Sequence, residues 1–220
     1  MAEKNKLAKI RKIITENNFF VVVFEITRRL SMVIYSVFCK ICTWIKLRGN
    51  GVKYSDLSTN GIPMIEVSIG GKFIIGNNFH MQNGRHYNKI GRQQPCIFTV
   101  AKGGTLTFGE NVGISHSAFF CTSKITLGNN VMIGGNCVFY DTDFHSLNFL
   151  HRRDRLIDHE NQKSAPILIH DDVFIGAHST ILKGVTIGEK SIIGAGSIVS
   201  KSIPPNEIWA GNPIAFIRSL

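Results

Sequence analysis

Two different patterns of apolar residues divide the chain. Residues 1–48 contain neither Gly nor Pro and are rich in Leu, Ile, Val, Phe and Lys, which is typical of helices. From about residue 62, helical periodicity is lost and Gly, Asn and β-branched residues take over. We therefore expect a basic, apolar helical segment and linker over 1–61 and a second, repetitive unit over 62–220.

An apolar residue recurs every six positions in the C-terminal part of that unit. The positions are Ile169, Ile175, Ile181, Ile187, Ile193 and Val199. Each six-residue unit predicts a short strand that points its apolar residue inward and a turn in which Gly or Asn allows positive φ. Three such units complete a triangular coil, and stacked coils pair as parallel sheets and bury one another's faces.

The same repeat is found upstream, with breaks in phase. One upstream run begins with Ile69, Ile75 and Met81, and breaks fall near residues 82–107, 121–126 and 140–166. Breaks in a repeat usually mark loops expelled from the coil. The inserted loop at 141–166 is longer than an ordinary connection. Its arginines suit a sugar phosphate or carboxylate, but the segment is equally consistent with a short exposed helix.

The terminal repeats resemble those of a known family. The segment Ile187–Val199, read IGEKSIIGAGSIV, and the exit IPPN followed by AGNP are similar to the last coil of bacterial hexapeptide-repeat acyltransferases, in particular their sugar O-acetyltransferase branch. The resemblance covers roughly residues 62–220. It implies an all-β left-handed parallel β-helix, acetyl-CoA as co-substrate, and a homotrimer with active sites shared between subunits. The handedness rests on the resemblance, because ordinary crossover rules favour right-handed connections.

The resemblance identifies His145 as the general base. This residue stands in the motif DTDFHS over 141–146, which matches the position of the family's catalytic His. An imidazole ordinarily has a pKa of about 6.5 and accepts a hydroxyl proton near neutral pH. The implied mechanism is direct transfer from acetyl-CoA, with no covalent acyl-enzyme. We expect Asp143 to assist the base and Asp141 to bind the acceptor, although both also suit a role in capping the turn.

Other contacts follow from the resemblance alone. On the acceptor side they are His116, Ser117 and Phe174. Relatives often carry Asn near residue 116, and a turn position on the outside of the coil is the alternative for this His. Phe174 should face outward because Ile175 takes the inward position. On the coenzyme side the contacts are Ala177, Ala195, Ser200, Lys201 and Arg218. The two cations suit a CoA phosphate, or they are solvated surface charges.

Charge is concentrated at the N-terminal end. The chain carries a net charge of +10, of which residues 1–53 hold +8. We therefore expect no nucleic-acid partner, but an attraction of this segment to anionic lipid. The apolar runs Phe19–Phe24 and Leu30–Cys39 are each too short for a spanning helix, and no cleavable signal is evident. A helix in the membrane interface and a helix packed on the rest of the protein or on a neighbouring subunit remain alternatives. The expected location is the cytoplasm, at the inner face of the membrane.

The cysteines and histidines argue against a disulfide-stabilised protein and against a zinc enzyme. The 5 cysteines show no disulfide framework, which favours a reducing compartment. Cys39 and Cys42 form a lone CxxC without a second pair for zinc. A zinc carbonic anhydrase on the same fold would need three convergent His, and the candidates are His80, His86, His116, His145 and His151. Their spacing does not resemble that family's pattern, so we expect no metal.

The expected reaction is O-acetylation of a sugar, and its acceptor stays open. A hydroxyl of a capsule, exopolysaccharide or lipopolysaccharide intermediate, carried on a lipid, suits a membrane-bound enzyme. An N-acetyltransferase acting on an amino sugar is the nearest alternative, because His145 would serve either chemistry. A non-catalytic scaffold on the same fold is a further one. The sugar, the hydroxyl position and the acyl chain length do not follow from the residues.

Overall fold

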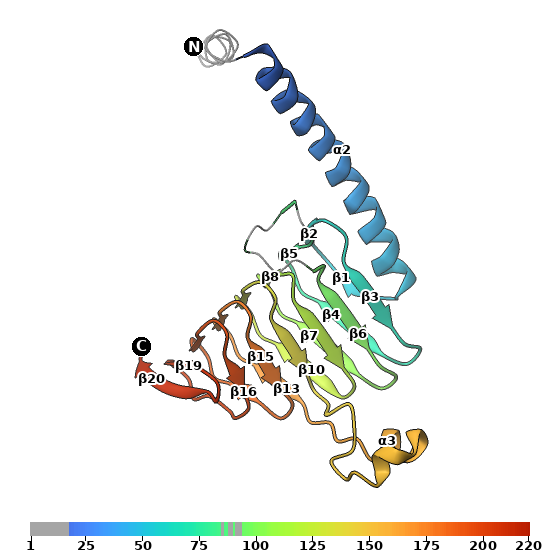
Figure 1. The fold of residues 1–220 in the computed structure, drawn as a ribbon, viewed down its shortest axis with the longest axis vertical. Helices are drawn as coiled ribbons and strands as arrows, with labels where there is room; N and C mark the ends of the chain where they lie inside the picture. Colours follow the sequence, from blue (N-terminus) through green and yellow to red (C-terminus); the bar gives the residue numbers. More distant parts are fainter. Residues whose placement is uncertain (1–17, 85, 88–89, 91–93) are drawn as a thin grey trace.

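The protein is a three-sided parallel β-helix with one long helix at its N-terminal end (Figure 1). The computed structural model describes residues 18–84, 86–87, 90 and 94–220. Each coil of the chain contributes one strand to each of three sheets, so that strands paired within a sheet are generally three strands apart in sequence. This is the stacking expected from a period of six.

The strands are short, and their bounds are as follows. Sheet A holds β1 (Lys53–Tyr54), β4 (Lys72–Ile75), β7 (Thr105–Phe108), β10 (Lys124–Leu127), β13 (Ile167–Ile169) and β16 (Thr186–Ile187). Sheet B holds β2 (Leu57–Asn60), β5 (Phe79–Gln82), β8 (Gly113–Ser115), β11 (Met132–Ile133), β14 (Phe174–Ile175), β17 (Ile192–Ile193), β19 (Glu207–Ala210) and β20 (Ala215–Ser219). Sheet C holds β3 (Met64–Val67), β6 (Ile97–Val100), β9 (Ala118–Cys121), β12 (Val138–Tyr140), β15 (Thr180–Leu182) and β18 (Ile198–Val199). The pairs are parallel except β19 with β20, which is antiparallel.

The core is a column of apolar side chains inside the coils. The six residues of the sequence repeat, Ile169 to Val199, are all buried there. Phenylalanines fill the earlier coils, and the rings of Phe119 and Phe139 stack with centroids 4.4 Å apart. Buried serines such as Ser179 stand beside the apolar residues and donate to backbone carbonyls, here to Gly176 O at 2.8 Å. The small residues of the repeat are therefore hydrogen-bonded inside the prism.

The first coil begins earlier than the sequence boundary at residue 62. Strand β1 begins at Lys53 and β2 at Leu57, so the segment assigned to a linker already forms part of the β-helix. This coil lacks the Ile-Gly pairs that mark later coils, and the periodicity therefore does not show it. Ile69 also departs from the prediction: it is 97% exposed in a turn, whereas Ile75 and Met81 are buried as expected.

Helix α2 (Phe19–Gly49) precedes the coils and leaves them at an angle (Figure 1). The side chain of Asn18 caps its first turn by accepting from Phe20 N. Its C-terminal part is docked through the buried stripe Cys39, Thr43 and Leu47, and nearer its middle Tyr35 lies against the rings of His86 and Tyr87. The residues of the stripe are four apart and so share one face of the helix. The predicted helical segment is confirmed for the described residues, and residues 1–17 lie outside them.

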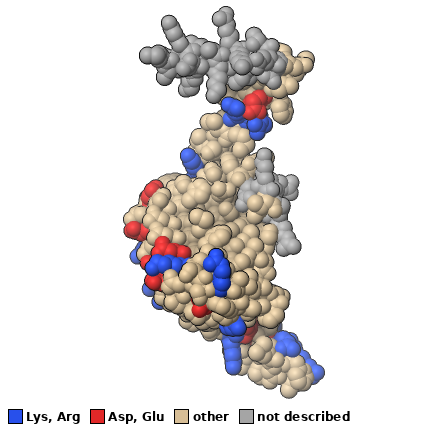
Figure 2. Space-filling view, turned by 90° about the vertical axis from the view of Figure 1, so that its left-hand side faces the viewer, with Lys and Arg blue, Asp and Glu red and all other residues tan. Residues whose placement is uncertain are grey.

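The remaining surface of α2 is exposed and apolar. Fifteen large apolar side chains from Phe19 to Ile45 are exposed, among them Phe20, Phe24 and Ile34 at 68–78%. Figure 2 shows this projecting part as mostly uncharged surface below a group of charges near its N-terminal end. The helix is long and apolar enough to cross a membrane by length and composition, with a mean hydropathy of 1.5 over its best window. The uncharged runs Phe19–Phe24 and Leu30–Cys39 are each too short to span a membrane, because charged residues separate them. The helix continues through those charged residues, so the expectation from the separate runs does not hold for the helix as a whole.

Candidate active site

The loop between β12 and β13 carries the candidate base. It leaves sheet C after Tyr140, holds the short helices η1 (His151–Arg153) and α3 (Arg155–Glu160), and rejoins sheet A at Ile167, so the predicted inserted loop at 141–166 lies where the repeat is interrupted. In Figure 1, α3 projects from the stack of coils on the side away from α2.

Asp141 anchors the start of this loop. Its buried carboxylate accepts from Thr122 N at 2.8 Å, Thr122 Oγ1 at 2.9 Å and Ser123 N at 2.7 Å. The carboxylate therefore ties the loop to the turn of the preceding coil. The prediction that Asp141 binds the acceptor is wrong in this structure, because both of its oxygens are used internally, and the capping alternative holds.

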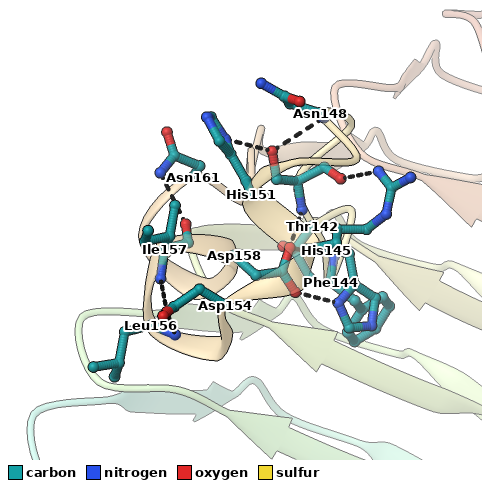
Figure 3. Close-up of polar contacts among 12 residues, drawn as sticks. Thr142, Phe144, His145, Asn148, His151, Asp154, Leu156, Ile157, Asp158 and Asn161 are labelled. Carbon is teal, nitrogen blue, oxygen red and sulfur yellow. Dashed lines mark hydrogen bonds and ion pairs between the residues drawn. The ribbon is translucent and has the colours of Figure 1, made fainter.

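His145 is exposed and held by a carboxylate that the sequence did not single out. Its Nδ1 lies 2.6 Å from Asp158 Oδ2, and 70% of the His side chain is exposed to solvent (Figure 3). A carboxylate can only accept, so the imidazole donates from Nδ1. The Nε2 atom of the neutral ring is then left as an acceptor, which is the tautomer a general base requires.

Asp158 belongs to α3 and is itself oriented by the loop. Its Oδ1 accepts from Ser146 N at 2.7 Å. The hydrogen bond from His145, and after it that from Ser146 N, lowers the pKa of Asp158 below its ordinary value. Asp154 caps α3 by accepting from Leu156 N at 2.9 Å and Ile157 N at 3.1 Å. The N-cap thus starts the helix turn that delivers Asp158 to His145.

A second set of contacts fixes the backbone beside the base. Ser146 Oγ lies 3.0 Å from His151 Nδ1, and Arg152 donates from Nη1 to Ser146 O at 2.6 Å. Both partners come from η1. Most of the residues in this network are labelled in Figure 3, where the dashed contacts join the 144–148 segment to the two short helices. The charged loop is therefore a folded support for His145.

Among the described contacts, none joins Asp143 to the imidazole. Its Oδ1 forms an ion pair with Lys183 Nζ at 3.1 Å, and its Oδ2 is buried without a hydrogen-bond partner among the described residues. The contact with the imidazole expected of Asp143 is made by Asp158 instead. In the sequence, Asp154 is the residue that points to Asp158. Asp is a favoured N-cap residue, so Asp154 predicts the start of a helix, and Asp158 lies in the first turn of that helix.

The acceptor residues predicted one coil earlier are inside the protein. His116 is buried at φ 48, and its backbone N donates to Gln82 O at 2.9 Å. Ser117 is also buried, and its hydroxyl contacts Ser115 O at 2.8 Å and Gly134 O at 3.2 Å. An acceptor does not reach these side chains from solvent, so both predictions are corrected. His116 does occupy a turn between β8 and β9, as the alternative had it, but its side chain is covered rather than exposed.

The predicted outward orientation of Phe174 is confirmed. This side chain is 42% exposed on sheet B, while Ile175 beside it is buried. Phe174 lies on sheet B, whereas β12, which precedes the 141–166 loop, lies on sheet C and β13, which follows the loop, lies on sheet A. No described contact joins Phe174 to His145.

The residues predicted to bind the coenzyme lie at turns and at the C-terminal end. Ala177 and Ala195 occupy equivalent turns of successive coils, because the backbone N of each stands 2.5 Å from where a Cβ on Gly134 or Gly176 would lie. Ser200 and Lys201 follow β18 and are exposed. Lys201 Nζ lies 4.9 Å from the ring centroid of Trp209. Arg218 is exposed on β20. Lys201 and Arg218 therefore remain accessible to an anionic ligand.

Metal ligands do not gather among the residues that the structure describes. No group of three His, Cys, Asp or Glu side chains there could hold an ion. All five cysteines are free thiols, and Cys39 is buried in the docked face of α2. Burial raises the pKa of Cys96 and of Cys121 to about 12 and that of Cys137 to about 11. These thiols lie inside the coils and offer no nucleophile to a bound substrate.

Comparisons with known proteins agree with this architecture. The family model of bacterial transferase hexapeptide repeats matches residues 166–201. A protein of Staphylococcus aureus (strain Mu50), provisionally named an acetyltransferase, is 42% identical over a region covering 44% of this chain and 56% of its own length. The galactoside O-acetyltransferase of Escherichia coli (strain K12) is 42% identical and covers 44% of each chain. This chain therefore spans about half the length of these curated relatives.

A solved structure extends the match over most of the fold. The maltose O-acetyltransferase of Clostridium difficile 630 superposes with a TM-score of 0.50 and 25% identity, covering 86% of this chain and 88% of that chain. The predicted left-handed parallel β-helix and the resemblance to hexapeptide-repeat acyltransferases are confirmed by the repeats, the sheets and these relatives together.

Proposed function

We propose that this hexapeptide-repeat protein is an O-acetyltransferase that moves the acetyl group of acetyl-CoA to a sugar hydroxyl, with His145 as the general base. The observation that carries the proposal is the 2.6 Å contact between His145 Nδ1 and Asp158 on an otherwise exposed imidazole. A His held in one tautomer at the surface of a loop is arranged for proton transfer rather than for packing.

The mechanism follows from that tautomer. Nε2 of His145 takes the proton of the acceptor hydroxyl while the oxygen forms a bond to the thioester carbon. The tetrahedral intermediate then collapses, the carbon–sulfur bond breaks, and the imidazolium returns the proton to the departing thiolate. Asp158 stabilises the positive charge on the ring between these steps. The remaining catalysis is the positioning of two bound substrates.

Named relatives support a sugar as the acceptor. The Escherichia coli relative is a galactoside O-acetyltransferase, and the structural neighbour from Clostridium difficile is a maltose O-acetyltransferase. We assign the acceptor here to an intermediate of a surface polysaccharide, carried on a lipid. Support for the lipid comes from α2, whose exposed apolar surface would bring the site to a membrane.

Two further parts complete the proposed enzyme. Acetyl-CoA would run along the coils past Ala177 and Ala195 toward Ser200, with its phosphates near Lys201 and Arg218. Three copies would form the trimer implied by the resemblance, with each site shared between neighbours. Light scattering of the purified protein tests the trimer directly, because it returns the mass of one or of three chains of 24.5 kDa.

The proposed location is the cytoplasmic face of the membrane, with the projecting part of α2 inserted among anionic lipids. Insertion would bury apolar side chains that the described structure leaves in water, and each fully buried Phe would contribute about 2–3 kcal/mol. The basic residues of the N-terminal segment add attraction to anionic headgroups. Packing of α2 against neighbouring copies is the competing arrangement.

Thiol release tests the activity. Acetyl-CoA is mixed with methyl galactoside, maltose or a lipid-linked sugar, and free CoA thiol is measured for the wild type and His145→Ala. We expect acceptor-dependent release that falls by about 10²–10⁴-fold in the variant. Mass spectrometry and NMR of the product then separate oxygen from nitrogen acylation. Equal turnover by the variant would remove His145 from the mechanism.

Vesicle flotation tests the location. Wild type and the triple variant Phe19→Ser, Phe20→Ser, Phe24→Ser are floated with phosphatidylcholine vesicles with or without about 30% phosphatidylglycerol. We expect the wild type to float with the anionic vesicles and the variant to stay at the bottom. A wild type that never floats, and whose α2 holds a trimer together, would favour subunit packing instead.

A further inference from the structure

Three aromatic rings meet on the outer face of sheet C, beside the loop that carries His145. Phe120 of β9 and Tyr140 of β12 are paired in the register of the two strands, and each follows a buried Phe. Side chains alternate along a strand, so both rings point outward. The ring of Phe144 lies against them, with centroids 4.7 Å from Phe120 and 5.2 Å from Tyr140.

The backbone of Phe144 is unusual. Its φ is 63, in the left-handed region that favours Gly or Asn, and a bulky side chain is rarely found there. The other positive-φ positions outside glycine are mostly Asn or turn residues of the coils. Strain of this kind persists where surrounding contacts hold it and is concentrated at functional sites. Here the two neighbouring rings hold Phe144 in place.

Packing alone does not explain why the ring is at the surface. Phe144 remains 38% exposed after its contacts with Phe120 and Tyr140. It directly precedes His145, whose side chain is also exposed. An exposed aromatic surface on an ordered loop, one residue from a catalytic base, is an arrangement that favours ligand binding.

We propose that Phe120, Tyr140 and Phe144 form the platform on which the sugar acceptor stacks, with Phe144 in direct contact. This inference rests on the proposed function and names the residues that would give it acceptor specificity. A pyranose has a face of C–H groups that packs on an aromatic ring, while its hydroxyls stay free for hydrogen bonds at the rim. A sugar held on Phe144 lies next to His145 in the loop, where one hydroxyl can be deprotonated.

Substitutions at Phe144 separate the platform from a structural brace. Phe144→Gly removes the ring and suits the positive φ, so it should fold. Phe144→Leu keeps apolar volume without an aromatic face, and Phe144→Tyr keeps the ring. The matched control is Phe149→Leu, because Phe149 is an exposed ring of the same loop that contacts Arg153 instead.

Steady-state kinetics give the first readout. We expect Phe144→Gly and Phe144→Leu to raise the acceptor KM by roughly tenfold, the size of one stacking contact. The kcat and the acetyl-CoA KM should stay within about threefold. Phe149→Leu should behave as wild type, and the conservative Phe144→Tyr should restore most of the acceptor affinity that the other two variants lose. A fall in kcat at unchanged acceptor KM would overturn the platform and make Phe144 a support for His145.

Sugar binding without acetyl-CoA gives a readout that does not depend on turnover. Saturation-transfer NMR with methyl galactoside and with maltose should show contacts to the wild type and to Phe144→Tyr, and weak or absent contacts to Phe144→Gly. Equal signals from wild type and Phe144→Gly, or none from the wild type, would overturn the platform. Sugar binding that needs Phe144, without thiol release, would instead contradict the proposed reaction and leave the platform standing.

Discussion

Replacing Asp158 by Asn tests the arrangement around His145 most directly. The carboxylate makes two contacts, from His145 Nδ1 to Oδ2 at 2.6 Å and from Ser146 N to Oδ1 at 2.7 Å. An amide has only one acceptor oxygen. When this oxygen accepts from Ser146 N–H, the amide group faces the imidazole and donates to Nδ1. The ring proton then moves to Nε2, which is the atom that must accept the proton of the sugar.

The size of the effect follows from what the variant retains. Asp158→Asn keeps the imidazole and its place in the loop, so the loss should be smaller than the 10²–10⁴-fold expected when the base is removed. We expect kcat to fall by about 10–100-fold, because the useful tautomer becomes the minor one and the imidazolium loses its carboxylate partner. The KM values for acetyl-CoA and for the sugar should stay within about threefold, since Asp158 touches neither substrate in the proposed mechanism.

The matched control is Asp154→Asn in the same loop. Asp154 caps α3, and Asn is an equally good N-cap, so the control should retain full kcat and an unchanged melting temperature. Rates are measured by thiol release at pH 8 under saturating acetyl-CoA. An Asp158→Asn variant with kcat within threefold of wild type, or a control that loses as much, would refute the orienting role.

Three further predictions concern stability. Asp141→Ala should lower the free energy of unfolding by about 2–3 kcal/mol, because three loop-anchoring hydrogen bonds are lost, and urea titration measures this; an unchanged midpoint would contradict it. Gly176→Ala should lower the free energy of unfolding by about 1–3 kcal/mol or more, since the added Cβ would lie 2.5 Å from the backbone N of Ala195 in the next coil. The control Gly113→Ala, whose added Cβ meets nothing within 4 Å, should leave the melting temperature nearly unchanged. The raised thiol pKa values predict that the free energy of unfolding falls as pH rises above about 9, because the thiols of the unfolded chain ionise first. They also predict that Cys96, Cys121 and Cys137 of the native protein resist iodoacetamide at pH 8. Rapid alkylation of these three would show that the coils open.

The sequence predicted what depends on periodicity. A strict period of six over Ile169 to Val199 required stacked coils, and the break after Tyr140 located the inserted loop. The first coil was missed because its turns lack the Ile-Gly pairs of the repeat. The six-residue spacing to Ile75 and Met81 predicts that Ile69 faces inward, yet the turn at that point places it in solvent. Where the phase of the repeat is interrupted, composition alone does not decide which residue faces inward.

The six-residue period does not predict which side chains pair within the loop. His145 was found through its motif, whereas its partner stands 13 residues later in a segment without any period. The contact forms where Asp154 starts a helix turn and where Arg152 and His151 hold Ser146. Asp141 and Asp143 were closer in sequence, but the first points into the preceding coil and the second to Lys183. Proximity along the chain was a poor guide where several tertiary contacts compete.

The antiparallel pairing of β20 with β19 has a consequence for self-association. A stack of parallel coils exposes a strand edge at its last coil, and a second molecule could in principle continue the ladder there. In sheet B this edge is β19, and β20 covers it while running in the opposite direction. A coil of another chain arriving in register would meet a strand of the wrong polarity. The β19–β20 hairpin therefore opposes end-to-end association of β-helices into fibres through sheet B.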